Sequence, residues 1–236
     1  MKVLQRSFVA IGVVGLLGLA SLPSDAQTTE VTEVTGSAFA ANIAVTIVGG
    51  PALAFGPEPF VELAPDASNS PQADSLLSLN LSDIIVSDTL NAETSGALGP
   101  EGFVESSSSV EDFFFGAFET AFLSADVIES SCRADLEGVT GTTNLAEASA
   151  VDGTLAIPVS PAPNTVIDSP DPALTLTLNR QVENADGSLE VTALVLEIET
   201  QGISGTIELA QSVCGVVGET EVVPPGPVAA EPVFTG

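Results

Sequence analysis

Alternation of apolar and polar side chains is the feature that most constrains this chain. Residues 39–47 and 77–82 alternate in this way, and in residues 174–181 Leu174, Leu176 and Leu178 alternate with polar residues. A period of two indicates a strand with one buried face. No long helical periodicity follows residue 26, so we expect an all-β fold, specifically an antiparallel β-sandwich-like domain.

Turn residues divide the chain into short segments. Asn184, Asp186 and Gly187 separate two apolar runs, and Asp-Gly supplies the positive φ angles of a tight hairpin. We expect further strands over residues 122–133, 139–151, 189–198 and 203–214. Residues 51–75 and 91–112 show no clear alternation, and we expect loops there.

A phenylalanine-rich segment allows two secondary structures. It contains Phe113, Phe114, Phe115, Phe118 and Phe122. A short helix capped by residues 109 and 112 and a strand are both compatible with the pattern. Phenylalanine has no polar group for a wet interface, so we favour core packing over an exposed aromatic patch.

The N-terminal segment has the pattern of a secretory signal. Lys2 and Arg6 precede a small, apolar run over residues 8–22, and Ala26 is a small residue at the expected cleavage site. A membrane anchor is the alternative, although the run is short for a span of about 20 residues. We expect a signal peptide over 1–26, a flexible segment over 27–36, a β domain over 37–216 and a flexible Pro-rich tail over 217–236.

The charge balance disfavours several classes of partner. Removal of residues 1–26 takes away Asp25, Lys2 and Arg6, which leaves 31 acids against Arg133 and Arg180, a net charge of −29. Such a surface repels nucleic acid and anionic membranes. Solubility alone would also explain the charge. We expect both arginines to be structural counter-ions, with Arg180 on the same side of its strand as Leu178 and Val182; the alternative is that they are the positive feature of a site.

Cys132 and Cys214 are the two cysteines of the chain. An even number in an exported protein favours one disulfide, which would stabilise the fold by roughly 4 kcal/mol. Two buried free thiols are the alternative, and metal ligation is a poorer one because the chain has no histidine.

The expected mature chain contains no His, Tyr, Trp or Lys. This absence removes histidine-based triads, lysine nucleophiles and tyrosine acids. Carboxylate-dependent hydrolysis remains chemically open, but nothing selects a pair among the acids. We therefore expect a protein that is not an enzyme.

Calcium is the second use of carboxylates, and it makes the hairpin a candidate site. Glu183, Asn184, Asp186 and Glu190 offer oxygen ligands there, although Val182 breaks the EF-hand pattern. Solvated turn acids explain the same residues, so we expect no cofactor, with calcium as the alternative.

Residues 130–216 resemble the choice-of-anchor P family of exported bacterial proteins. The resemblance is carried by segments 131–132, 141–143, 162–165, 178–179, 184–188, 191–194 and 214–216. It implies a secreted or surface domain without assigned activity, and it supplies no catalytic residues. The tail differs from that family because it has no sortase-type motif and no terminal membrane segment.

These patterns together predict a secreted, acidic, non-enzymatic β domain. We expect an extracellular or cell-surface interaction or structural module with an unidentified extracellular partner, without nucleic acid and without membrane insertion after signal removal. The alternatives are a calcium-stabilised binding module and a carboxylate-dependent hydrolase.

Overall fold

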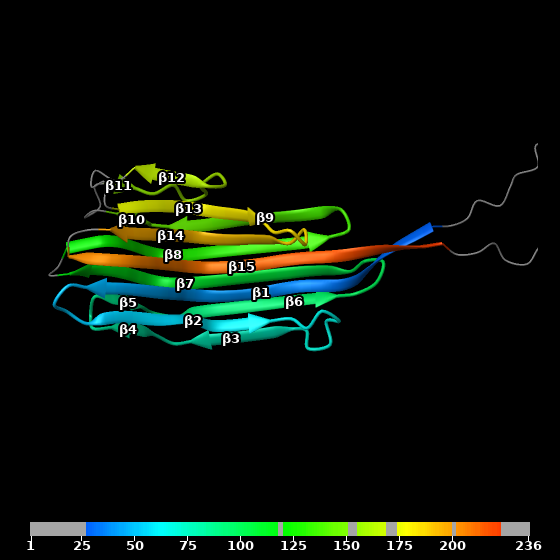
Figure 1. Ribbon diagram of the computed structural model, residues 1–236, viewed down its shortest axis with the longest axis horizontal. Helices are drawn as coiled ribbons and strands as arrows, with labels where there is room; N and C mark the ends of the chain where they lie inside the picture. The colour runs from blue at the N-terminus through cyan, green and yellow to red at the C-terminus, as the bar shows by residue number, and fades with distance from the viewer. Residues whose placement is uncertain (1–26, 118–119, 151–154, 169–173, 200–201, 223–236) are drawn as a thin grey trace, which may run out of the picture. The chain divides into compact units, whose positions relative to one another are not determined.

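The computed structural model describes residues 27–117, 120–150, 155–168, 174–199 and 202–222. These residues form two antiparallel sheets that pack against each other (Figure 1). Residues Thr28–Glu221 make up one unit of the chain. The all-β, sandwich-like fold class with one disulfide is thereby confirmed.

Sheet A contains six strands within the described residues. Their order across the sheet is β12 (Thr165–Asp168), β13 (Leu174–Glu183), β14 (Leu189–Glu199), β15 (Ile203–Val222), β1 (Gln27–Ile47) and β2 (Ala52–Glu62). The first and last strands of the chain are neighbours: Thr32 Oγ1 donates to Val217 O at 3.3 Å, and Val48 N donates to Gly202 O at 2.9 Å. From the first contact to the second, the residue number rises on the β1 side and falls on the β15 side, so β1 and β15 are antiparallel.

Sheet B contains nine strands within the described residues, with β7 (Phe103–Ala117) and β8 (Thr120–Asp135) at its centre. On one side of β8 lie β9 (Gly138–Ala146), β10 (Ser149–Ala150) and β11 (Leu155–Ala156). On the far side of β7 lie β6 (Leu90–Ala97), β5 (Ile85–Ser87), β4 (Leu79–Leu81) and β3 (Gln72–Leu76).

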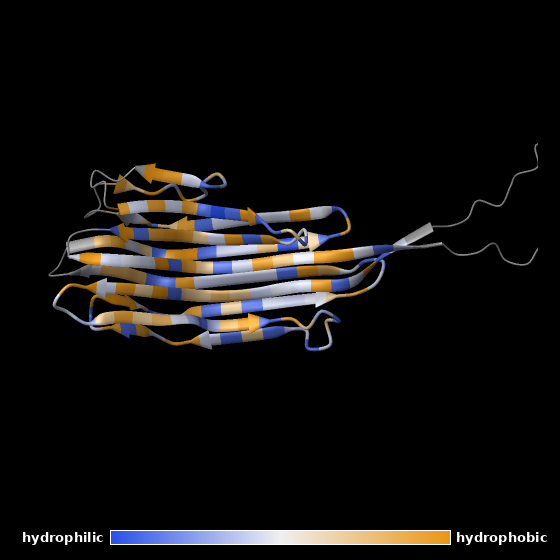
Figure 2. Ribbon diagram, in the orientation of Figure 1, coloured by the Kyte–Doolittle hydropathy of each residue, from blue (hydrophilic) through white to orange (hydrophobic). Residues whose placement is uncertain are grey.

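The apolar side chains of the alternating pattern are buried between the two sheets. Figure 2 shows apolar and polar segments alternating along the strands. The large buried side chains come from both sheets and include Ile43, Phe113, Ile128, Leu194 and Ile207. The phenylalanine segment is therefore strand and not helix over Phe113–Phe115, and Phe113 and Phe115 are core residues. Phe118 lies outside the described residues.

Several strands reverse their alternation in the middle. Asn179 has a φ of 50° and Ala210 a φ of 53°, in the left-handed region. Leu178 and Asn179 are both buried although they are consecutive, so the residues after them exchange faces. Gln181 Nε2 donates to Gly141 O of sheet B at 2.9 Å, which places Gln181 inside. Arg180 therefore points outward, as exposed Val182 does, and the prediction that it shares a side with Leu178 is wrong.

Two predicted loops are strands. Residues 51–75 contain β2 and most of β3, and residues 91–112 contain most of β6 and part of β7. The inward side chains of β6 and β7 include Thr94, Ser106 and Ser108, which are buried but polar. Because hydroxyl side chains occupy several inner positions, the segment lacks the regular apolar alternation by which strands are recognised. Leu77 lies outside a strand and is 83% exposed.

The strands also extend past the expected ends of the domain. Residues 27–36, expected to be a flexible segment, are the first half of β1, and β15 continues to Val222. Thr29 and Thr220 share a hydrogen bond between their hydroxyl oxygens at 3.2 Å. β1 and β15 are hydrogen-bonded neighbours in sheet A, and this side-chain bond joins them close to their outer ends.

Cys132 and Cys214 form a disulfide between the two sheets, with a Cα–Cα distance of 5.6 Å. Both cysteines are buried. Gly141 pairs with Cys132 in sheet B, and a Cβ atom on Gly141 would overlap the side chain of Val191 in sheet A. The sheets approach closely here because glycine has no side chain. No helix long and apolar enough to span a membrane occurs in the described residues.

Candidate functional site

The hairpin residues that are the candidates for the alternative of calcium binding serve the turn and the sheet. Asp186 Oδ1 accepts hydrogen bonds from Ser188 N at 3.0 Å and from Ser188 Oγ at 2.7 Å. The side-chain bond from Ser188 lowers the pKa of Asp186, and the backbone bond lowers it further. Asn184 Nδ2 donates to Ser188 Oγ at 3.0 Å. Both side chains therefore close the β13–β14 turn.

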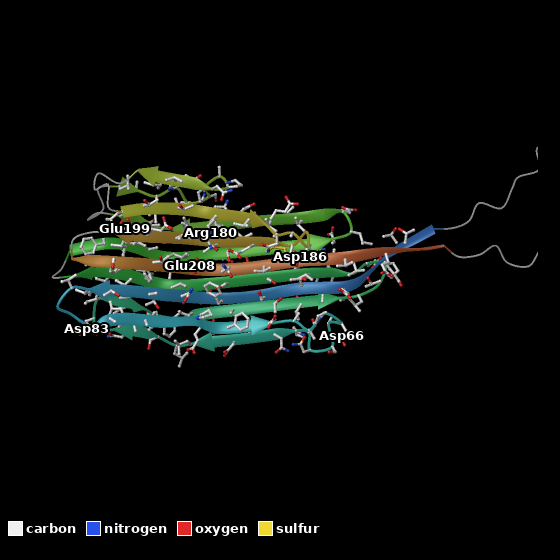
Figure 3. All side chains as sticks on the ribbon, in the orientation of Figure 1. Asp66, Asp83, Arg180, Asp186, Glu199 and Glu208 are labelled. Atoms are coloured by element: carbon white, nitrogen blue, oxygen red, sulfur yellow. A yellow bond between two sulfur atoms is a disulfide. The ribbon has the colours of Figure 1, made fainter. Side chains whose placement is uncertain are left out.

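The other two residues of that prediction lie on the strands. Glu190 forms an ion pair with Arg180 at 3.1 Å on the outer face of sheet A, and Glu183 pairs with Leu189 in the ladder. In Figure 3, Asp186 lies at the hairpin and Arg180 lies further along the sheet. Glu190 and Asp186 thus have separate partners, and the described residues hold no group of three acids or thiols that could bind a metal.

Arg180 is the centre of a side-chain cluster that connects four strands on the outer face of sheet A. Its Nη2 donates to Glu208 Oε1 at 3.0 Å, to Glu190 Oε1 at 3.1 Å and to Thr192 Oγ1 at 3.4 Å. Asn42 Nδ2 of β1 completes the cluster by donating to Glu208 Oε2 at 2.9 Å. Glu208 and Glu190 neutralise the arginine, so the geometry is that of a structural counter-ion.

The outer face of sheet B is a different surface, on which strand register arranges polar side chains in rows. One row contains Asn91, Ser109, Glu129 and Asn144; the next contains Glu93, Ser107, Ser131 and Thr142; the third contains Ser95, Glu105, Arg133 and Thr140. We call these twelve side chains the serine face. Most of their neighbours along each strand are buried, so the rows point away from the core.

The serine face is hollowed along β7. A depression of about 540 Å³ is lined by residues that include Gln72, Glu93, Glu105, Ser107 and Ser131. A second depression of about 310 Å³ is lined by residues that include Asn91, Glu93, Ser109 and Glu129. Glu93 and Ser107 belong to both, so the two hollows adjoin. The short serine side chains form the floor between longer glutamates.

The charges of the serine face are unevenly paired. Arg133 forms an ion pair with Glu105 and a second with Asp135 at 3.4 Å, and its guanidinium carbon lies 5.4 Å from the centre of the Phe103 ring. Arg133 and Arg180 are the basic side chains of the described residues, and neither pairs with Glu93 or Glu129. The face therefore offers two carboxylates without a cation.

A further group of acids lies beyond the serine face on the same sheet. Asp112 of β7 has a φ of 48°. Desolvation raises its pKa, and the negative charges of Asp88 and Asp126 and a hydrogen bond with Asp88 raise it further. The negative charges of Asp88 and Asp126 therefore oppose ionisation of Asp112.

Sequence reasoning missed the serine face because the relevant residues were assigned to a loop. In the run Ser106–Ser109 the residue type is constant while the side chains point alternately inward and outward. Ser106 and Ser108 are buried, and Ser107 and Ser109 point outward. Identical residues at inner and outer positions leave no hydropathy signal. The repeated acids at residues 93, 105 and 129 were visible, but their proximity depends on pairing between distant strands.

Fold and surface together define a disulfide-linked antiparallel β-sandwich with a polar, carboxylate-rich outer face. Comparison with family models, with curated proteins and with solved structures gives no significant match.

Proposed function

We propose that this chain is a secreted, acidic, non-enzymatic β domain that acts as an extracellular or cell-surface interaction module through its serine face. The observation that carries the proposal is the hollowed array of outward hydroxyl, amide and carboxylate groups on β6, β7, β8 and β9. Such a surface can donate and accept many hydrogen bonds to a partner, and it lies on a rigid sheet.

The disulfide supports the extracellular part of the proposal. Disulfides form and persist in oxidising compartments, and the bridge between Cys132 and Cys214 joins the two sheets. The signal pattern over residues 1–26 points to the same compartment, but those residues lie outside the described ones. Membership of the choice-of-anchor P family stays a prediction that agrees with this location.

The chemistry of the serine face supports binding rather than catalysis. Its side chains are serines, threonines, asparagines, glutamates and one arginine, and no histidine occurs in the chain to activate a serine. A glycosidase needs two acids on opposite sides of a cleft that admits a sugar. The hollows on this face are open to solvent and lie on the outer side of a sheet, which suits a docked partner better.

Export and surface binding together test the proposal. The full-length chain should appear outside the producing cells with Gln27 as its first residue and without free thiols, as read by mass spectrometry. Fluorescently labelled mature protein should then bind saturably to the surface of those cells. Recovery of the intact chain only from cytosol would refute secretion.

A pair of long, uncharged substitutions tests the surface. Ser107→Gln with Ser131→Gln fills the hollow and keeps the net charge, so we expect cell-surface binding to fall strongly. The control is Thr175→Gln with Thr206→Gln, which places two glutamines at a hollow of about 340 Å³ on sheet A, beside Glu197 and Glu199 of β14. This pair should leave binding unchanged. Equal binding by the wild type and both variants would show that the serine face is not the interaction surface.

A further inference from the structure

We infer that the partner of the serine face is an extended basic segment of another protein, which lies along β7 and presents Lys or Arg at alternate positions. The inference rests on the proposed function and names the chemistry of the partner. It follows from the placement of charges on this face, from the register of the strands and from the side chains that the face lacks.

The first argument is the sign and availability of charge. Glu93, Glu105 and Glu129 line the two adjoining hollows, and Arg133 is the single base of the face and is paired with Glu105 and Asp135. A third hollow of about 310 Å³ around Arg133 is also lined by Glu101, Asp135 and Glu137. Acidic side chains therefore outnumber basic ones across all three hollows, and a cationic partner would complement this charge.

The second argument is spacing. Glu105, Ser107 and Ser109 are successive outward residues of β7, and successive rows on one face of a strand are about 6.6–6.8 Å apart. Glu93 pairs with Ser107 from β6, and Glu129 pairs with Ser109 from β8. An extended segment above the serines would bring a basic side chain to each successive row if every second residue were Lys or Arg.

The third argument concerns other occupants. Neither an aromatic ring nor a large apolar side chain occurs among the twelve residues of the serine face. The ring in the adjoining row, Phe103, already has the guanidinium of Arg133 over it, so the face offers a sugar or a base little to stack on. Nucleic acid and a second copy of this chain would each bring more negative charge. The described residues also hold no cluster of acids suited to a metal ion.

Peptide binding tests the inference directly. The probe is a twelve-residue peptide of alternating Lys and Ser, titrated into the mature protein by calorimetry at low and at physiological salt. Saturable binding that weakens with salt is expected. Absence of binding at low salt would overturn the inference.

Two pairs of charge-neutralising substitutions separate this face from general attraction to a polyanion. Glu93→Gln with Glu129→Gln removes both unpaired carboxylates of the serine face. Glu197→Gln with Glu199→Gln removes two exposed carboxylates from the outer face of sheet A, so the net charge changes equally. We expect the first pair to weaken binding roughly fivefold and the second pair to leave it within about twofold. Equal weakening would overturn the inference.

A peptide of the same composition with its lysines in one block tests the register. It should bind several-fold more weakly, and equal affinity would refute the alternate spacing. The outcome is distinguishable from failure of the proposed function. If Ser107→Gln with Ser131→Gln abolishes cell-surface binding but the alternating peptide neither binds nor competes, the serine face is an interaction surface and its partner is not a basic segment.

Discussion

Ser130 of β8 and Thr143 of β9 are directly paired in sheet B, and the hydroxyl oxygens of both are buried without a hydrogen-bond partner among the described residues. Burial of a hydroxyl without a partner weakens a fold. The interior near the disulfide thus contains polar groups whose removal should be favourable.

Replacement of Thr143 by valine should therefore stabilise the domain. Valine keeps the shape of threonine and removes the unpaired hydroxyl, so we expect the free energy of unfolding to rise by about 1 kcal/mol. Urea denaturation measures this. Thr94→Val is the matched control: Thr94 shares a buried hydrogen bond of 2.8 Å with Ser106, so its loss should destabilise by a similar amount. Destabilisation by both changes would contradict the assignment.

The disulfide should provide a large share of the stability. It closes a sequence separation of 82 residues. The chain-entropy treatment gives about 4 kcal/mol for a loop of that size. The double substitution Cys132→Ala with Cys214→Ala removes the bridge without introducing a buried polar group, so it should lower the urea midpoint accordingly. Reduction of the wild type should lower the midpoint to a similar value. An unchanged midpoint would show that packing between the sheets suffices.

The two arginines should differ in their importance for the fold. The side chain of Arg180 is 30% exposed and holds Glu190 and Glu208, whose side chains are 26% and 19% exposed. Arg180→Met leaves both acids without their cation, and we expect a loss of about 1–2 kcal/mol in thermal or urea unfolding. The side chain of Arg133 is 50% exposed, so Arg133→Met should cost about 0.5 kcal/mol or less. Equal losses would argue against the structural role of Arg180.

The acids near Asp112 predict a specific dependence on pH. The pKa of Asp112 is raised in the folded state by desolvation and by Asp88 and Asp126, so its ionised form opposes folding. The destabilising contribution of Asp112 is therefore present at neutral pH and is lost as pH falls through the raised pKa. Asp112→Asn should make the domain more stable than wild type at pH 7, and the difference should shrink towards pH 4.

Asp186 supplies the opposite sign for comparison. Its pKa is lowered by Ser188, so its stabilising contribution is present above the ordinary value of 3.8 and is lost as pH falls through the lowered pKa. Asp186→Asn should destabilise at pH 7, with the loss fading in acid. Chemical denaturation of both variants between pH 3 and pH 7 measures the two trends, and parallel trends would contradict the assignment.

Calcium should have no special effect on the hairpin. Asp186 is bonded to Ser188 and Glu190 to Arg180, so neither carboxylate is free to serve an ion without loss of its partner. We expect millimolar Ca²⁺ to shift the melting temperature no more than equal Mg²⁺. A selective rise with Ca²⁺ would favour the calcium-stabilised alternative.

Some elements were predictable because their signal is local. The leucines of β13 and the Asp186-Gly187 turn predict a hairpin, since a turn and the alternation beside it involve neighbouring residues. The same reasoning failed for Arg180, because Asn179 in the left-handed region reverses the faces of the strand. A single change of φ has no reliable signature in residue type when asparagine also occurs in ordinary turns.

The candidate site was less accessible to such reasoning. Glu93, Ser107 and Ser131 form one row, but they lie on three strands whose pairing is set by contacts far apart in the chain. Serines at both inner and outer positions of β7 gave no indication of which of them would be exposed.

The sequence alone determined the sheet-rich class of the fold, the strong negative charge, the absence of histidine chemistry and the two cysteines available for a bridge, because these follow from residue type and short-range periodicity. The tertiary structure alone decided which carboxylates lie together, which hydroxyls are buried and which way each arginine points. Those properties depend on strand register and on local reversals of the backbone, which bring together residues that the linear order keeps apart.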